Sequence, residues 1–284
     1  MCTSNITLQK FCKLLFEVYL YKVLIFILFW ISGYETLNMQ SLIRLTLPVS
    51  SVADNFTGCF ILFWLTIPFL NILIKNMSQK QHLYLLVLSL IIYVVLPLLP
   101  FNRVVMNYVT WFIVLYFISS YIRLYNIKLF SNRTWGGLTL LLIVLSMSSV
   151  IACLKLDLNP YWFVSDSNAI LAVLVGISSF MFFKDVRISY SKFINTLGAS
   201  TFGVLLIHAN SDAMRTWLWR DTLNNIGWFN NDVLVVIAHS IISVLLIYSI
   251  CTLIDCLRIK FLEKPFFSRF GDKIDKLENK IFAS

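Results

Sequence analysis

Charged residues are scarce in this sequence of 284 residues, of which only 13% are Asp, Glu, Lys or Arg. A soluble globular protein has about a quarter of its residues charged, and the 59% of hydrophobic residues here exceeds what a water-facing surface can carry. The sequence also lacks a Gly-rich phosphate loop, an internal repeat and a low-complexity linker. A soluble fold is therefore excluded, and lipid is the expected solvent for most of the chain.

The 6 cysteines carry no signature of a metal site. They lie in or beside apolar segments, without a C-x-x-C pair and without a neighbouring histidine. Cysteine in such surroundings behaves as a small apolar residue. We therefore expect no bound metal.

Long apolar runs are what the sequence has in abundance. A helix rises about 1.5 Å per residue, so roughly 20 apolar residues cross a hydrocarbon core about 30 Å thick. These runs lack the alternation of barrel strands, and only helices and closed barrels satisfy the backbone in lipid. We expect an all-α polytopic membrane helix bundle with about eight spans. The expected spans are residues 14–33, 56–74, 83–100, 107–124, 137–154, 168–184, 199–212 and 232–255.

Lysine and arginine gather in alternate loops between these spans. They are concentrated before the first span, at Lys75 and Lys80, in residues 123–133 and 184–192, and after the last span. Cytoplasmic loops retain positive charge, so both termini are expected in the cytoplasm. The formal net charge of +9 then reports topology, and no nucleic-acid partner is expected.

Two regions follow from this pattern. Residues 1–255 form the expected transmembrane domain, and residues 256–284 form a basic tail. In the tail, Phe270, Ile274, Leu277 and Ile281 recur at helical spacing among charged residues. The spacing predicts an amphipathic helix that lies on the cytoplasmic leaflet.

Few ionisable residues fall within the expected spans, where each costs about 2.5–3.5 kcal/mol on insertion scales. Glu17 and Lys22 lie in the first span, and structural pairing is favoured over a functional role, with Lys22 paired to Glu17 or to another helix. Asp255 and Arg258 are i, i+3 neighbours at the end of the last span. We expect a salt bridge between them at the membrane interface.

His208 ends the apolar run 203–208 and is followed closely by Asn210, Asp212 and Arg215. A neutral imidazole beside a carboxylate or amide can take a proton near pH 7, as acyl or glycosyl transfer to a hydroxyl requires. The alternative is a histidine at a helix end, hydrogen-bonded to a loop carbonyl. Spacing alone favours that alternative.

His239 is expected about two turns inside the last span. One interpretation is that His208 and His239 face the same cavity. The other is that His239 forms a hydrogen bond to a facing helix through Ser240 or Ser243. Three tryptophans of the expected outer loop are interpreted as an aromatic belt at the headgroup level: Trp217, Trp219 and Trp228.

The stretch FINTLGASTFGVLLIH, residues 193–208, resembles the C-terminal signature of the membrane acyltransferase 3 family. Three further parts of the chain are similar to the same family in order and spacing: residues 67–71, residues 111–125, and residues 215–219 with residues 262–265. The family comprises bacterial multi-pass enzymes that O-acetylate or otherwise acylate cell-surface polysaccharides.

The beginning of the sequence departs from that family. Members usually open with two more spans, the first of which holds an arginine followed on the same helix by a histidine taken to be catalytic. This sequence has no such pair, and its first histidine, His82, is expected in a cytoplasmic loop. We expect an N-terminally incomplete member, which is a fragment, a chain with a moved start codon or a degenerate homologue.

The resemblance implies an O-acyltransferase, in the simplest case an O-acetyltransferase, of the bacterial cytoplasmic membrane. It would need no bound cofactor, and would move an acyl group from acyl-CoA to a hydroxyl of a polysaccharide or lipid-linked sugar. His208 would be a supporting or positioning catalytic residue, Arg215 would hold the acceptor or the oxyanion, and Asn210 and His239 would bind substrate. Cations on the cytoplasmic side would bind the CoA phosphates: Arg123, Lys128, Arg133, Lys184, Arg187 and Lys192.

Two other functions remain open from the residues. A transporter or glycan flippase would use the same buried histidine and arginine, although we find no inverted repeat and no paired Gly/Pro-broken spans. A non-catalytic membrane partner in polysaccharide assembly is the second alternative. Binding of acyl-CoA distinguishes the enzyme from both.

Overall fold

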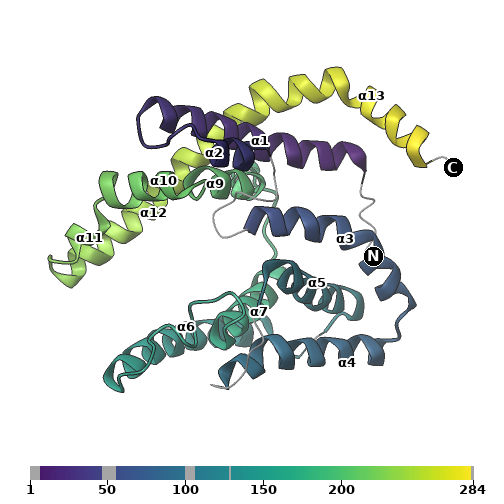
Figure 1. The fold of residues 1–284 in the computed structure, drawn as a ribbon. Coiled ribbons are helices and arrows are strands. Elements are labelled where there is room, and N and C mark those ends of the chain that lie inside the picture. Colours follow the sequence, from purple (N-terminus) through teal and green to yellow (C-terminus); the bar gives the residue numbers. More distant parts are fainter. Residues whose placement is uncertain (1–6, 47–55, 100–105, 128, 283–284) are drawn as a thin grey trace. The chain divides into compact units, whose positions relative to one another are not determined.

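A computed structural model describes residues 7–46, 56–99, 106–127 and 129–282, and all regular secondary structure in these residues is helical (Figure 1). Six segments of this part of the chain are long and apolar enough to cross a membrane. They are α1 (Leu8–Ile31), α3 (Phe56–Asn76), α4 (Gln79–Leu90) with its continuation to Leu98, α5 (Tyr108–Tyr125), α6 (Asn132–Lys155), and α12 (Val233–Arg258) with its continuation to Lys280. The prediction of an all-α, multi-pass membrane protein is confirmed to this extent.

The other two expected spans are shorter in the structure. Residues 168–184 contain α7 (Ile170–Lys184), whose 15 residues rise about 22 Å. Residues 199–212 contain α9 (Thr201–His208), whose 8 residues rise about 12 Å, less than half of a hydrocarbon core. A break at Ser200 separates α9 from α8 (Lys192–Ala199). The count of eight spans and the cytoplasmic termini stay predictions.

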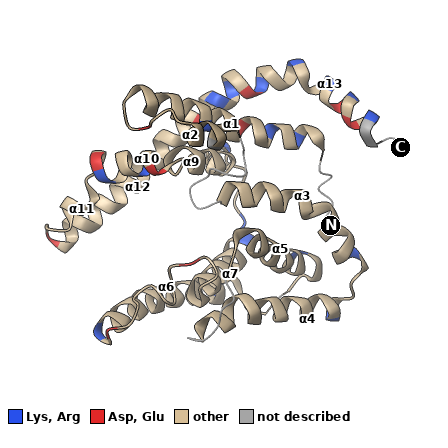
Figure 2. Cartoon of the chain, viewed as in Figure 1, with Lys and Arg blue, Asp and Glu red and all other residues tan. Residues whose placement is uncertain are grey.

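The remaining elements are short turns of helix and one longer tail helix. They are α2 (Met39–Thr46), η2 (Ile91–Val95), η3 (Leu96–Leu98), α10 (Asp212–Arg215), η4 (Thr216–Thr222), α11 (Asn225–Trp228), η5 (Ile259–Glu263) and α13 (Lys264–Phe282). Figure 2 shows little charge along α3, α4 and α6 except near their ends, and positive and negative residues interspersed along α13.

The start of α4 corrects one expectation. The Ser78 and Gln81 side chains form a reciprocal capping box, which satisfies free backbone N–H groups of the first turn. The helix therefore begins before the expected span, and His82 lies in its first turn. The placement of His82 in a loop was wrong, because its ring is fully buried, with Nε2 3.2 Å from the carbonyl oxygen of Phe117 in α5.

The chain divides into two compact units, which we describe separately. The middle unit, Phe63–Ser189, contains most of α3 and all of α4 to α7. Its α6 and α7 are antiparallel, since a Cβ on Gly136 at the start of α6 would contact the Phe182 ring near the end of α7. Asn168, just before α7, donates a hydrogen bond of 2.6 Å to the carbonyl of Tyr93 in η2. The apolar core lies around Trp111 of α5.

The terminal unit combines Asn5–Leu62 with Tyr190–Ser284. Its core is formed by one face of α1, with Val18 and Ile25, against Val204 of α9 and Ile247 of α12. These contacts give each long apolar helix a buried stripe, while the rest of its surface stays apolar, as expected for helices that face lipid.

The tail helix α13 runs antiparallel along the first half of α1. Phe16 of α1 stacks on Phe266 with ring centroids 5.1 Å apart, and the Leu8 backbone N–H donates to Glu278 at 3.0 Å. The structure thus has a helix where the sequence predicts one. Its position on a membrane leaflet stays a prediction.

Candidate functional site

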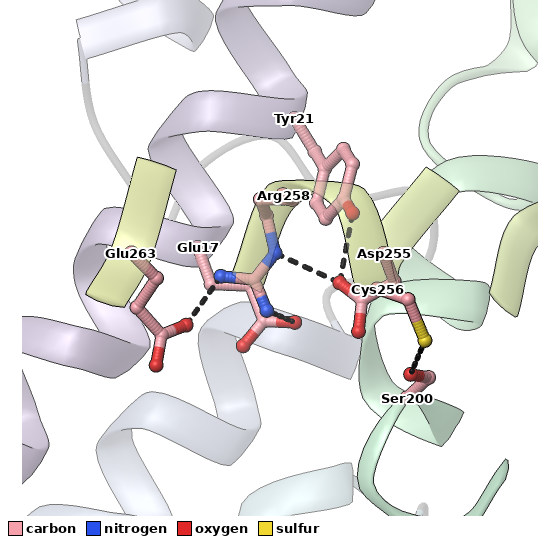
Figure 3. A network of polar contacts seen from close by, with 7 residues as sticks. All are labelled: Glu17, Tyr21, Ser200, Asp255, Cys256, Arg258 and Glu263. Carbon is pink, nitrogen blue, oxygen red and sulfur yellow. Dashed lines mark hydrogen bonds and ion pairs between the residues drawn. The ribbon is translucent and has the colours of Figure 1, made fainter. Parts of the chain in front are cut away.

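A buried ionic network joins α1, α12 and η5 of the terminal unit (Figure 3). The Arg258 guanidinium donates from Nε to Asp255 at 2.8 Å and from a terminal nitrogen to Glu263 at 2.6 Å. Its other terminal nitrogen pairs with Glu17 of α1 at 3.1 Å. The Arg258 side chain is 4% exposed and that of Asp255 is 0% exposed. One buried guanidinium therefore uses all three of its nitrogens to hold three carboxylates.

Asp255 is the most deeply buried member of this network. Its Oδ1 accepts from Arg258 and, at 2.8 Å, from the Tyr21 hydroxyl of α1. Its Oδ2 is buried and has no hydrogen-bond partner in the described part of the chain. Burial of a charged oxygen is costly unless it is paired, so the network is stable only while Arg258 and Tyr21 stay in place.

A glycine allows α9 to approach the network. A Cβ on Gly203 would overlap the Asp255 carboxylate, so only glycine fits here without a shift. One turn earlier, the Ser200 hydroxyl lies 3.7 Å from the Cys256 sulfur. Gly203 belongs to residues 193–208 and Glu263 to residues 262–265, so two of the stretches on which the family resemblance rests meet around Arg258.

The sequence predicted part of this network. The expected Asp255–Arg258 salt bridge is confirmed, but its burial and its two further carboxylates were missed. Glu17 pairs with Arg258 of α12. The signal was an excess of ionisable residues in apolar helices, each of which needs a partner, but the sequence does not say which partner each one takes.

His208 lies at the end of α9, where it is half-buried. Its Nδ1 lies 2.6 Å from the carbonyl oxygen of Val204, which can only accept, so Nδ1 carries the proton of that hydrogen bond. In the neutral imidazole Nε2 is then the nitrogen with the free lone pair. The ring also meets the Trp219 indole edge-on, with centroids 6.4 Å apart.

Other contacts place His208 near the C-terminal end of α1, whereas the ionic network lies at the middle of that helix. Trp217, beside Trp219 in η4, contacts the Phe29 ring with centroids 5.9 Å apart. Glu17 and Phe29 are separated by about 18 Å along α1. The histidine and the ionic network are therefore separate features, although Gly203, which approaches Asp255, precedes His208 by only five residues on α9.

Asn210 and Arg215, which follow His208, each contact a residue three or four positions away in the sequence. The Asn210 side chain donates 2.9 Å to the carbonyl of Leu206, one of the free carbonyls at the end of α9. Arg215 lies 3.9 Å from Asp212 as an i, i+3 pair. Both side chains thus have structural partners, and their roles in substrate binding stay predictions.

His239 makes a different set of contacts from His208. Its ring stacks on Trp228 with centroids 4.5 Å apart, and its Nε2 lies 3.5 Å from Ser243 on its own helix. The contact with Ser243 lies within α12, so it is not the expected hydrogen bond to a facing helix. A cavity shared by the two histidines stays a prediction.

Four of the cations predicted to bind the donor lie at one end of the middle unit. Arg123 is in the last turn of α5, Arg133 in the first turn of α6 and Lys184 at the end of α7, followed by Arg187. The six-residue link from α5 to α6 and the antiparallel α6–α7 pair bring these ends together. Lys128 lies outside the described residues.

Comparison with known proteins gives no relative from which to transfer a role. No model of a protein family, no curated protein and no solved structure matches this chain. A function can therefore be proposed only from the sequence resemblance and from the residues and contacts described above.

Proposed function

We propose that this chain is an integral membrane O-acyltransferase of the bacterial cytoplasmic membrane, with eight spans and both termini in the cytoplasm. It transfers an acyl group, in the simplest case acetyl, from acyl-CoA to a hydroxyl of a polysaccharide or lipid-linked sugar. The family resemblance of residues 193–208 supplies the reaction class. The geometry of His208 is the observation that supports it within this chain.

His208 has the tautomer that a general base needs. Because Nδ1 donates to the Val204 carbonyl, Nε2 is free to accept the proton of an attacking sugar hydroxyl. The half-buried ring at the end of a helix is held by two contacts, Val204 and Trp219, so its direction is fixed before substrate binds. Trp219 lies in residues 215–219, another stretch on which the resemblance rests.

The remaining roles follow from charge. Arg215, one short loop after His208, offers a cation for the oxyanion that forms when the hydroxyl attacks the thioester. Arg123, Arg133, Lys184 and Arg187 at the end of the middle unit offer cations for the phosphates of CoA. Lys128 joins this set on its sequence position alone.

Transfer of a labelled acetyl group tests the proposal. Membrane vesicles that contain the protein receive acetyl-CoA carrying ¹⁴C in its acetyl group, and the label is measured in extracted polysaccharide and lipid-linked sugar. Mild alkali should release that label, because the new bond is an ester. His208→Gln should lower the rate by about 10²–10⁴-fold, and Arg215→Gln by about 10²–10³-fold.

The chain offers a control for the arginine. Arg220 lies in η4, the helical segment directly after Arg215, and pairs with its neighbour Asp221 at 2.7 Å, so Arg220→Gln should leave the rate unchanged. Circular dichroism establishes that the His208→Gln variant is folded. If the wild-type protein neither transfers label nor binds acetyl-CoA, the enzymatic proposal fails and a transporter or a non-catalytic assembly partner takes its place.

A further inference from the structure

The middle unit contains an apolar cavity of about 510 Å³ between α5 and α7. On α5 its lining extends from Trp111 to Ile122, a length of about 17 Å at 1.5 Å per residue. On α7 it extends from Ala172 to Phe180. The volume is within the range of small-molecule sites, about 300–1,000 Å³.

Two polar side chains of this lining already have hydrogen-bond partners within the protein. The Tyr116 hydroxyl donates to the Asn71 side chain, and the Ser119 hydroxyl donates to the Tyr116 carbonyl at 3.1 Å. Most other lining residues are aliphatic or aromatic. A molecule with unsatisfied amides or hydroxyls would lose hydrogen bonds to water without replacement, whereas a hydrocarbon chain would lose none.

Two cations lie at one end of the same helical faces. Tyr116, Ser119 and Arg123 are spaced i, i+3 and i+7, so Arg123 follows the lining residues of α5 by one turn. Phe180 and Lys184 are i, i+4 neighbours on α7. Because α5 and α7 end at the same end of the unit, both cations flank the same mouth of the cavity. Asp185 pairs with Lys184 at 3.5 Å, so Arg123 is the stronger anion site.

We propose that this cavity holds one acyl chain of an anionic phospholipid, whose phosphate lies between Arg123 and Lys184. Basic pockets between membrane helices are where anionic headgroups bind. Charge at the mouth and hydrocarbon in the interior match the two parts of such a lipid. This inference does not depend on the proposed enzymatic activity.

An acyl-CoA fits this cavity less well than a phospholipid. Its phosphates are separated from the acyl carbons by the pantetheine arm, whose two amides would enter the apolar cavity directly behind the cations. Burial of amides without partners is unfavourable. This lipid would occupy two of the four cations proposed above for the donor, Arg123 and Lys184, and would leave Arg133 and Arg187 for the phosphates of CoA.

Gly176 provides a way to fill the cavity without a clash. It lines the cavity on α7, and a Cβ placed there meets no atom within 4 Å. Gly137 on α6 is a matched control, because it also has no atom within 4 Å and is not part of the lining. Gly176→Leu should therefore occupy the space of the acyl chain, and Gly137→Leu should not.

Photolabelling tests the proposal on the full chain in detergent. The probes are phosphatidylglycerol and phosphatidylcholine that carry a diazirine in one acyl chain, and labelled peptides are mapped by mass spectrometry. Phosphatidylglycerol should label α5 and α7 in the wild type and in Gly137→Leu, but not in Gly176→Leu. Arg123→Gln should lower the preference for phosphatidylglycerol by about fivefold.

Three results would overturn the proposal. Equal labelling of α5 and α7 by phosphatidylglycerol and phosphatidylcholine would mean that Arg123 and Lys184 do not select an anionic lipid. If phosphatidylglycerol labelled α5 and α7 of the Gly176→Leu variant as strongly as those of the wild type, its acyl chain would not lie in this cavity. Loss of labelling on addition of acetyl-CoA would assign the cavity to the acyl donor, an outcome that contradicts the lipid without contradicting the acyltransferase.

Discussion

In the terminal unit a buried guanidinium holds three carboxylates, whereas the middle unit places apolar rings at its centre and uses uncharged hydrogen bonds between helices. Arg258 contacts Asp255, Glu17 and Glu263, while the polar contacts that join helices in the middle unit include Asn168 to Tyr93 and His82 to Phe117. Removal of one partner from a buried ion pair costs about 3–5 kcal/mol, but an uncharged hydrogen bond in a membrane protein averages about 0.6 kcal/mol.

This difference predicts how strongly each unit responds to a single substitution. In the terminal unit, a single substitution leaves buried charges unpaired, and α1, α9 and α12 depend on one another through Arg258 and Gly203. In the middle unit, the loss of one contact leaves the packing of the other helices intact. Sensitivity to point mutations should therefore be concentrated at the ionic network.

The largest effect is expected for Arg258→Ala, which leaves three carboxylates without their common cation. The free energy of unfolding should fall by about 3–5 kcal/mol, measured by titration with sodium dodecyl sulfate and followed by tryptophan fluorescence. Lys260→Ala is the matched control, since Lys260 is an exposed cation two residues later. Equal losses in the two variants would refute a special role for the network.

Gly203→Ala should give the next largest effect. The new methyl group overlaps the Asp255 carboxylate, and overpacking of this kind costs about 1–3 kcal/mol. Gly198→Ala on α8 is the control, because a Cβ there meets no atom within 4 Å and alanine is the better helix former. If the two alanine variants have the same stability in the detergent titration, the close approach of α9 to Asp255 is wrong.

Asn168→Ala probes the uncharged contacts of the middle unit. It removes the hydrogen bond from Asn168 to the Tyr93 carbonyl, and we expect a loss of about 0.6 kcal/mol, and at most about 1.7 kcal/mol. The same titration measures it. A loss as large as that of Arg258→Ala would remove the distinction between the two units.

The smallest effect is expected at an exposed ion pair of the terminal unit. The hydrogen bond from Arg220 lowers the pKa of the Asp221 carboxyl below its ordinary value of 3.8, and the Tyr34 hydroxyl also donates to it. A lowered pKa means that the ion pair contributes to stability at every pH above the ordinary pKa of the carboxyl. That contribution is lost only as the pH falls through the lower pKa of the folded protein.

Because this pair is exposed to solvent, its contribution is small. Asp221→Asn should leave the midpoint of the detergent titration at pH 7 unchanged. Titration of the Asp221 carboxyl should also not change the midpoint of the wild-type protein between pH 5 and pH 7. A shift comparable to that of Asn168→Ala would show that exposure does not weaken the pair.

Several elements of this comparison were predictable from the sequence, and others were not. The i, i+3 spacing of Asp255 and Arg258 predicted their salt bridge, because helical spacing alone brings them together. The contact of Glu17 with Arg258 spans most of the chain length, and no local pattern specifies it. His82 was placed in a loop because the apolar run begins after it, and its burial depends on contacts with α5.

The His208 region shows the same limit. The sequence marked the residue by its position after an apolar run and by the resemblance of residues 193–208. The favoured interpretation, a histidine at a helix end hydrogen-bonded to a carbonyl, agrees with the structure except that the carbonyl is Val204 of the same helix and not of a loop, and the contact with Trp219 was not predicted. The sequence also predicted one span over residues 199–212, where the structure has a helix only over Thr201–His208, because hydropathy is averaged over many residues and does not locate the ends of a helix.

The sequence by itself determined that this protein is helical and that its helices suit a lipid environment. Only 13% of its residues are charged, and in lipid its repeated apolar runs can satisfy their backbone hydrogen bonds only as helices. Tertiary structure alone decided that Glu17 pairs with Arg258 and where the apolar cavity lies. These features depend on contacts between helices far apart in the sequence, and apolar helices of similar composition carry little information about which neighbours they choose.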